Sequence, residues 1–98
     1  MNKIYVILYN AYEIDDIEKG DLTPIYCSLS QVNRDKKYDE LVKDSHKQFN
    51  KYSNEDDYWE QDDICDLHEL NYSIGKWSYH YRTVEYDLDK DLRYEHNI

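Results

Sequence analysis

The chain has 98 residues and a formal net charge of −10, from 22 acidic and 12 basic side chains. A chain this short buries only about two-thirds of its unfolded surface, so residues 1–98 are expected to form a single domain. The charge disfavours direct binding to nucleic acid or to a membrane, because affinity for either normally comes from clustered lysine and arginine. Twelve tyrosines argue against a disordered acidic chain, which would be poor in aromatic residues. A basic partner is expected, because it would relieve the self-repulsion of the negative charges.

The first third of the chain predicts two strands. Residues 3–9 are β-branched or aromatic on both pleat faces, which is typical of a covered central strand. Residues 10–22 carry five acids and include Gly20, which indicates a hairpin-like connection. Pro24 then marks the edge of a short second strand at residues 25–27. The N-terminal residues show no cleavage site for secretion, which predicts an intracellular protein.

A long stretch without glycine or proline follows and predicts a helix. Ser28 stands three residues before Gln31, which is the spacing of a capping box and indicates a helix start. The helix is expected to end near Tyr52, before a polar segment. One face repeats apolar or small side chains at helical spacing, which is typical of an amphipathic helix that lies on a sheet. Its members are Tyr38, Leu41, Val42, Ser45, Phe49 and Tyr52.

Residues 76–89 predict another strand, and residues 90–98 are polar and predicted to fray. Large side chains alternate along the strand at odd positions before Arg82 and at even positions after it, namely Trp77, Tyr79, Tyr81, Val84, Tyr86 and Leu88. This change of parity predicts a β-bulge or a strand that crosses between packing layers. The expected fold class is α+β: a small antiparallel sheet of about three to four strands, with one long amphipathic helix packed on one face.

Residues 53–69 hold eight acids and no lysine or arginine, and neither helix nor loop is favoured there. Carboxylates spaced a few ångströms apart can imitate the phosphates of duplex DNA, and tyrosine and tryptophan are strong anchors at interfaces. The combination favours binding to a groove lined with arginine and lysine. The predicted partner-binding residues are Glu55, Asp56, Asp57, Tyr58, Trp59, Glu60, Asp62, Asp63, Asp66 and Glu69. The alternative is a solvated segment that only keeps the protein soluble.

Metal and catalytic sites are not expected. A calcium loop of the EF-hand type needs a central glycine, and residues 53–69 contain none. If this segment were helical, Asp62, Asp66 and Glu69 would share one face and could hold a divalent ion weakly. The histidines and cysteines show no zinc-ligand spacing, so no cofactor and two free thiols are expected. With two glycines and no nucleophile elbow or phosphate-binding loop, the chain is not expected to be an enzyme.

The chain resembles small phage-encoded counter-defence proteins, including anti-CRISPR proteins and other DNA-mimicking inhibitors. The resemblance covers its short length, its negative charge, its many tyrosines, its strand-strand-helix-strand order and a composition typical of an A+T-rich genome. It implies a stoichiometric inhibitor in the bacterial cytoplasm that occupies the nucleic-acid-binding surface of a basic defence nuclease. Two alternatives stay open: an accessory protein that sequesters a small ligand or regulates a host enzyme, and a structural protein that self-associates. The target and the oligomeric state are left open.

Overall fold

A computed structural model describes residues 2–64 and 67–88. Within these residues the chain forms the elements β1 (Lys3–Glu13), β2 (Thr23–Ser28), α1 (Gln31–Tyr52), β3 (Trp59–Ile64), β4 (Leu67–Ile74) and β5 (Trp77–Asp87). The strands make one five-stranded sheet in the order β2-β1-β5-β4-β3, and every neighbouring pair is antiparallel. The α+β class with one helix on a sheet is confirmed, but the sheet has five strands rather than three to four.

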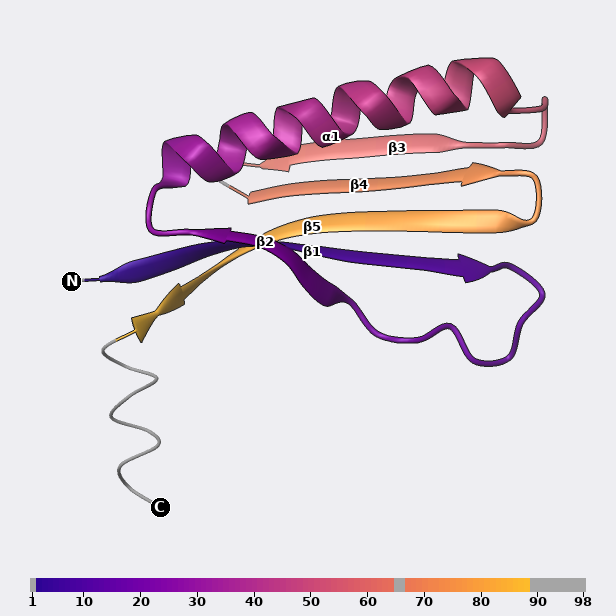
Figure 1. Cartoon of the computed structure of the whole chain (residues 1–98). Helices are drawn as coiled ribbons and strands as arrows, with labels where there is room; N and C mark the ends of the chain where they lie inside the picture. Colours follow the sequence, from indigo (N-terminus) through magenta and orange to yellow (C-terminus); the bar gives the residue numbers. More distant parts are fainter. Residues whose placement is uncertain (1, 65–66, 89–98) are drawn as a thin grey trace.

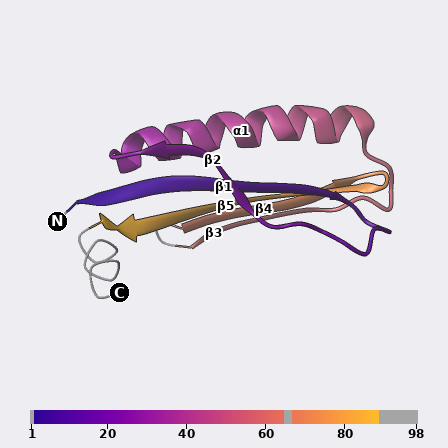
Figure 2. The ribbon, with the colours of Figure 1, turned by 60° about the horizontal axis from the view of Figure 1, so that its bottom comes forward.

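The helix and the sheet form two layers (Figures 1 and 2). The chain leaves β2 at one edge of the sheet, crosses one sheet face as α1 and returns as β3 at the opposite edge. The other face of the sheet carries no helix among the described residues, and we call it the open face. Within residues 2–64 and 67–88, no helix combines the length and apolar character needed to cross a membrane.

The helix begins two residues later than the capping box predicts. Ser30, rather than Ser28, is the N-cap: its backbone is extended and its hydroxyl oxygen accepts a hydrogen bond from Asn33 N–H at 3.2 Å. The Ser28 hydroxyl instead accepts a hydrogen bond from Ser30 N–H at 3.0 Å. The predicted end is confirmed, because Tyr52 is the last helical residue and Ser53 N–H closes the final turn on the carbonyl of Phe49.

The core lies between α1 and the sheet. Its buried apolar members are Ile7, Tyr38, Leu70 and Tyr72, and Leu41, Val42 and Phe49 of the predicted helical stripe pack against them. Ser45 of the same stripe is also buried. Tyr52 departs from the prediction, because 54% of it is exposed where the helix ends at the margin of the sheet.

The β-bulge predicted as one explanation of the parity change in the last strand is wrong. β5 pairs with β1 without interruption, from Asp87 opposite Lys3 to Trp77 opposite Glu13. The change of side-chain parity therefore places Val84 on the open face, while the aromatic residues before it pack under α1. The shift in register lies between β1 and β2, where the partner of β1 moves from Tyr26 to Pro24.

Candidate functional site

Three connections meet at one end of the sheet: residues 14–22 between β1 and β2, residues 53–58 between α1 and β3, and residues 75–76 between β4 and β5. Ile14 N–H donates a hydrogen bond to the carbonyl of Lys76 at 2.7 Å, which joins the first connection to the third. We call this region the loop end. Figure 1 shows it at the end of the sheet away from the N-terminus.

Asp57 organises the loop end from within. Its carboxylate accepts hydrogen bonds from the backbone N–H of Asn54 at 2.7 Å, from the backbone N–H of Gly75 at 3.1 Å and from the hydroxyl of Ser73 at 3.1 Å. These bonds, the one from Asn54 first, hold the pKa of Asp57 below its ordinary value. Gly75 has a φ of +60°, which glycine adopts without strain. Asp57 is therefore a structural residue of two adjoining turns rather than a solvated carboxylate.

The surface of the loop end is rich in carboxylates. The exposed ones come from two of the three connections and are Asp15, Asp16, Glu18, Asp21, Glu55 and Asp56. Lys19, which lies among them, is turned back onto the fold: its ammonium group donates to the carbonyl of Ile14 at 2.8 Å and lies 4.6 Å from the ring centroid of Tyr12. Lys76, which is exposed on the third connection, is the other lysine of the three connections, so six exposed carboxylates stand against two lysines.

Large apolar side chains stand among these carboxylates. Ile17 is 96% exposed at the tip of the first connection, next to Asp16 and Glu18. Four further residues at this end are exposed by two-fifths or more, namely Ile14, Tyr52, Tyr58 and Trp77. Together they make up half of the large exposed hydrophobic residues in the described part of the chain. Gathered apolar side chains with a polar surround are typical of an interaction surface.

The acidic stretch predicted as a binding surface is divided by the fold. Glu55, Asp56 and Tyr58 lie at the loop end, where the Tyr58 hydroxyl also lies 3.2 Å from Ser78 Oγ. Trp59, which was expected to be an interface anchor, points under α1. Its ring centroid lies 5.0 Å from that of His46, 5.4 Å from Phe49 and 5.2 Å from Tyr72. Asp66 lies outside the described residues.

The remaining carboxylates of the stretch lie on β3 and β4. Glu60 and Asp62 are exposed on the open face of β3, and Asp62 is opposite Glu69 of β4. Glu69 also lies 2.8 Å from His80 Nε2 and accepts a bond from Asn71 at 3.4 Å. Partial burial acts to raise the pKa of Glu69, but these bonds and the charges of His80 and Arg82 outweigh it and hold that pKa below its ordinary value.

Asp63 of β3 belongs to a polar cluster with residues of α1 and β4. His68 Nδ1 lies 2.8 Å from Asp63 and its Nε2 lies 3.8 Å from Asp35. Asp35 also pairs at 3.0 Å with Arg34, a fully buried residue that sequence analysis did not place in the interior. Tyr38 stacks on His68 at 5.1 Å. These contacts join α1 to β3 and β4.

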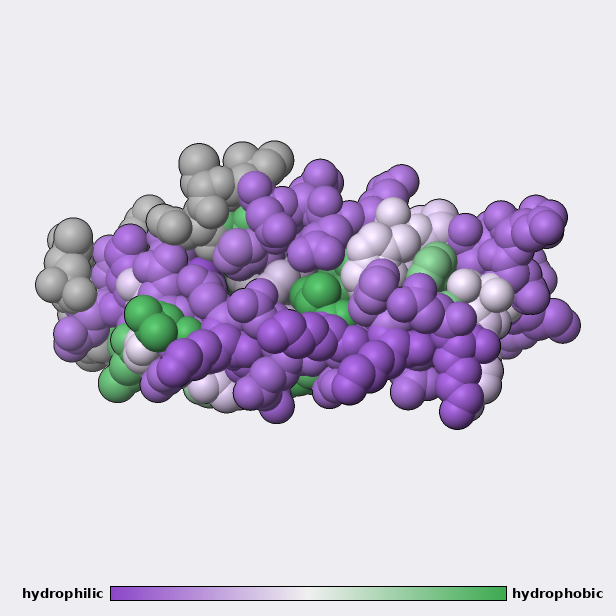
Figure 3. Space-filling model, turned by 90° about the horizontal axis from the view of Figure 1, so that it is seen from above, coloured by the Kyte–Doolittle hydropathy of each residue, from purple (hydrophilic) through white to green (hydrophobic). Residues whose placement is uncertain are grey.

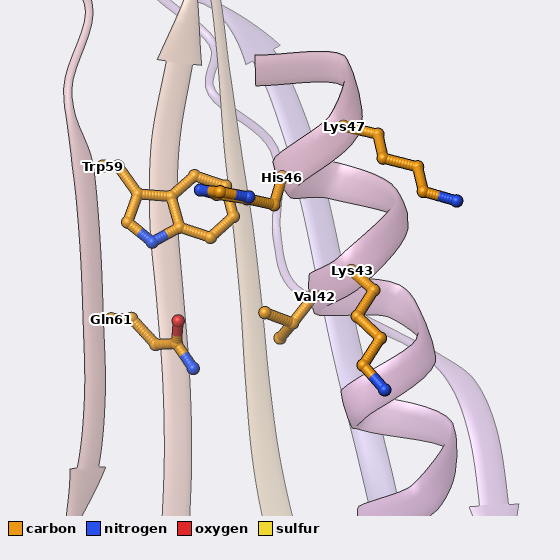
Figure 4. A pocket seen from close by; sticks show the side chains of 6 residues that line it. All are labelled: Val42, Lys43, His46, Lys47, Trp59 and Gln61. Carbon is orange, nitrogen blue, oxygen red and sulfur yellow. The ribbon is translucent and has the colours of Figure 1, made fainter. Parts of the chain in front are cut away.

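A groove of about 490 Å³ runs between α1 and β3 (Figure 4). Its walls are Val42, Lys43, His46 and Lys47 from α1 and Trp59 and Gln61 from β3. The figure shows His46 against the indole of Trp59, whereas the side chains of Lys43 and Lys47 extend away from it. Sequence analysis did not identify this groove, because it depends on how α1 is placed beside an edge strand.

The first connection was also missed as part of a candidate surface, although its four acids were counted among the five of residues 10–22. Their excess over lysine was the available signal. Among the residues that the structure describes, no group of three histidine, cysteine, aspartate or glutamate side chains is arranged to hold a metal ion. Cys27 is exposed with a free thiol, and Cys65 lies outside the described residues. Comparison of the chain with protein-family models, with curated proteins and with solved structures finds no match.

Proposed function

We propose that this chain is a binding protein whose loop end occupies a basic, nucleic-acid-binding surface of another protein, and that it thereby inhibits a bacterial defence nuclease. The observation that carries the proposal is that two acidic connections and several exposed large apolar residues, Ile17 above all, lie at the same end of the sheet, with the connection of residues 75–76 between the two. This arrangement differs from the continuous acidic stretch expected from sequence, but it offers the same chemistry, carboxylates together with large apolar side chains.

Electrostatics favours a basic partner over other classes. The chain carries a net charge of −10, which accelerates encounter with a positive surface and opposes approach to nucleic acid. Carboxylates held on separate connections can follow a curved groove, whereas carboxylates along a single strand point alternately to opposite faces of the sheet. The loop end therefore suits a concave surface that normally receives phosphates.

The apolar side chains supply affinity that charge alone does not. An exposed ion pair contributes about 0–1 kcal/mol, whereas an apolar anchor that becomes desolvated in a partner can contribute about 2 kcal/mol or more. Ile17 gains most from such burial, because almost all of its surface is in water in the isolated chain. Charge would then govern the rate of association and Ile17 the lifetime of the complex.

Capture of partners from bacterial lysate tests the proposal. The loop-end variant combines Asp15→Asn, Glu55→Gln and Asp56→Asn, and its matched control combines Asp39→Asn, Glu40→Gln and Asp44→Asn on α1. Both variants change the net charge by the same amount at exposed positions. We expect wild type and the control to retain one basic nucleic-acid-binding protein at moderate salt, and the loop-end variant to lose it.

Two outcomes would contradict the proposal. Equal retention by both variants would show that the loop end is only a solubilising surface. Thermal stabilisation by a nucleotide, without any retained protein, would favour the accessory protein that sequesters a small ligand. Circular dichroism of each variant checks that the fold is kept.

A further inference from the structure

We propose that the outer edge of β3 binds an extended, basic segment of a partner protein, which adds to the sheet as a further strand beside α1. The inference goes beyond the proposed function, because it uses a surface separate from the loop end and does not require that the partner be a nuclease. It rests on three features of β3: its free edge, the groove beside it and the charges on its open face.

The two edges of the sheet are protected in different ways. β2 carries Pro24 and the shift in register against β1, and both features hinder the pairing of another strand. β3 contains neither proline nor glycine, and it pairs with β4 without a shift from Trp59 opposite Tyr72 to Ile64 opposite Leu67. Among the described residues, no strand pairs with its outer side. The charged side chains of β3 oppose pairing with another acidic strand, but they do not oppose pairing with a basic one.

The backbone of β3 offers regularly spaced groups on this edge. Ser73 N–H of β4 donates a hydrogen bond to the carbonyl of Tyr58 at 3.1 Å, which sets the phase of the ladder. Because bonding alternates along an antiparallel pair, the peptide groups of Trp59, Gln61 and Asp63 face away from β4. Their side chains point toward α1, so an added strand would bond to the edge and place alternate side chains in the groove.

The groove suits apolar side chains from such a strand. The ring of Trp59 and the side chain of Val42 line it. Seen from the side of α1, the surface is mostly hydrophilic, with apolar areas near its middle and toward one end (Figure 3). A small-molecule site would instead need several polar groups that converge on the ligand. Here the ammonium groups of Lys43 and Lys47 extend away, and the polar groups on the β3 side are the amide of Gln61 and the indole N–H of Trp59 (Figure 4).

The open face sets the charge of the partner. Side chains on adjacent strands lie about 4.5–5.5 Å apart, so an added strand would bring alternate residues next to Glu60 and Asp62. Asp62 lies opposite Glu69 of β4, so an acidic side chain beside Asp62 on the added strand is disfavoured and lysine or arginine is favoured. A second copy of this chain would place its own Glu60 and Asp62 against these carboxylates, which disfavours self-pairing. The occupant that fits is a segment that alternates basic and apolar residues.

Short synthetic peptides test the inference by hydrogen exchange and Trp59 fluorescence. The first probe alternates valine and lysine, the second has glutamate in place of lysine, and the third has the valines and lysines of the first in two separate blocks. The alternating lysine peptide is expected to slow amide exchange at Trp59, Gln61 and Asp63. It is expected to bind about tenfold more tightly than either control peptide.

Gln61→Pro provides the matched edge-blocking variant. It removes an outward backbone N–H that does not bond to β4. Gln61→Ala keeps that N–H and likewise removes the glutamine side chain from the groove. Because both variants lack the Gln61 side chain, we expect Gln61→Pro to bind the peptide at least about tenfold more weakly than Gln61→Ala, which isolates the contribution of the outward N–H. If Gln61→Pro does not fold, the exchange pattern in the wild-type chain decides.

Several results would overturn the inference: no slowing at the three outward amides, equal effects of the lysine and glutamate peptides, or displacement of the peptide by adenosine monophosphate. The loop-end variant separates the two proposals. Unchanged peptide binding by that variant supports a distinct site, and lost binding would place the peptide at the loop end, which refutes the edge site while leaving the proposed function in place.

Discussion

Asp57 stabilises the turns of the loop end through hydrogen bonds to their backbone. Its bonds to Asn54 and Gly75 join two turns, so Asp57→Asn is expected to lower the melting temperature at neutral pH. Because the pKa of Asp57 is lowered by folding, its stabilising effect is present above its ordinary pKa of 3.8 and is lost as pH falls through the folded-state value. Wild type and variant should therefore converge in acid.

Thermal unfolding from neutral pH down to about pH 2.5 measures this convergence. Asp56→Asn is the matched control, because the carboxylate of Asp56 is exposed. The melting temperature of this variant should follow that of wild type at every pH. A gap between Asp57→Asn and wild type that persists unchanged in acid would show that the charged carboxylate is not the source of the stability.

Tyr38 contrasts with Asp57, because its hydroxyl is buried and has no hydrogen-bond partner among the described residues. Burial raises the pKa of Tyr38, with further contributions from the charges of Asp63, Glu69 and Asp39. An unpaired buried hydroxyl costs free energy, so Tyr38→Phe is expected to leave the free energy of unfolding unchanged or to raise it by up to about 1 kcal/mol.

Urea denaturation checks this result against Tyr58→Phe. The Tyr58 hydroxyl lies 3.2 Å from Oγ of the buried Ser78, so its removal is expected to lower the free energy of unfolding by about 0.5–1.5 kcal/mol. A loss in Tyr38→Phe as large as that in Tyr58→Phe would mean that the Tyr38 hydroxyl has a stabilising partner.

At the scale of elements, Trp59 is the side chain that fastens β3 to α1. It contacts His46 and Phe49 of α1, so Trp59→Ala is expected to lower the free energy of unfolding by about 2–4 kcal/mol. Because it points into the groove side of the sheet rather than to the loop end, partner binding at the loop end should be retained by the folded variant. Unfolding in urea gives the first quantity and titration with the captured partner the second. Wild-type stability with lost affinity would restore Trp59 as an interface anchor.

The elements differ in how much of them local sequence determines. The helix and the strands β1 and β5 could be predicted, because each carries a long apolar or aromatic pattern of its own period. β3 could not be, since Glu60, Gln61, Asp62 and Asp63 have low strand propensity and their conformation depends on pairing with β4. The sheet therefore contains β3 and β4 in addition to the three strands whose residues were predicted.

The candidate site was predictable in its chemistry but not in its position. The eight acids of residues 53–69 were evident, yet strand alternation sends Glu60 and Asp63 to opposite faces. The contribution of residues 14–22 depends on the pairing of β1 with β5, which brings Ile14 beside Lys76. Such long-range pairing cannot be read from a local pattern.

At the scale of the whole molecule, the sheet serves as a scaffold with two separate surfaces, the loop end and the edge of β3. A net charge of −10 costs folding free energy through self-repulsion, and a basic partner would relieve it on binding. Rising salt is therefore expected to weaken the complex mainly by slowing association, with a smaller effect on the loop-end variant than on wild type.

Competition with duplex DNA for the captured partner tests the central claim most directly. The measured quantity is the fraction of the partner bound to labelled DNA as the chain is added at fixed salt. We predict that wild type and the control variant with substitutions on α1 displace the DNA in a stoichiometric manner, that the loop-end variant does not, and that the chain alone never shifts the DNA. Simultaneous binding of DNA and wild-type chain to the partner would contradict the account.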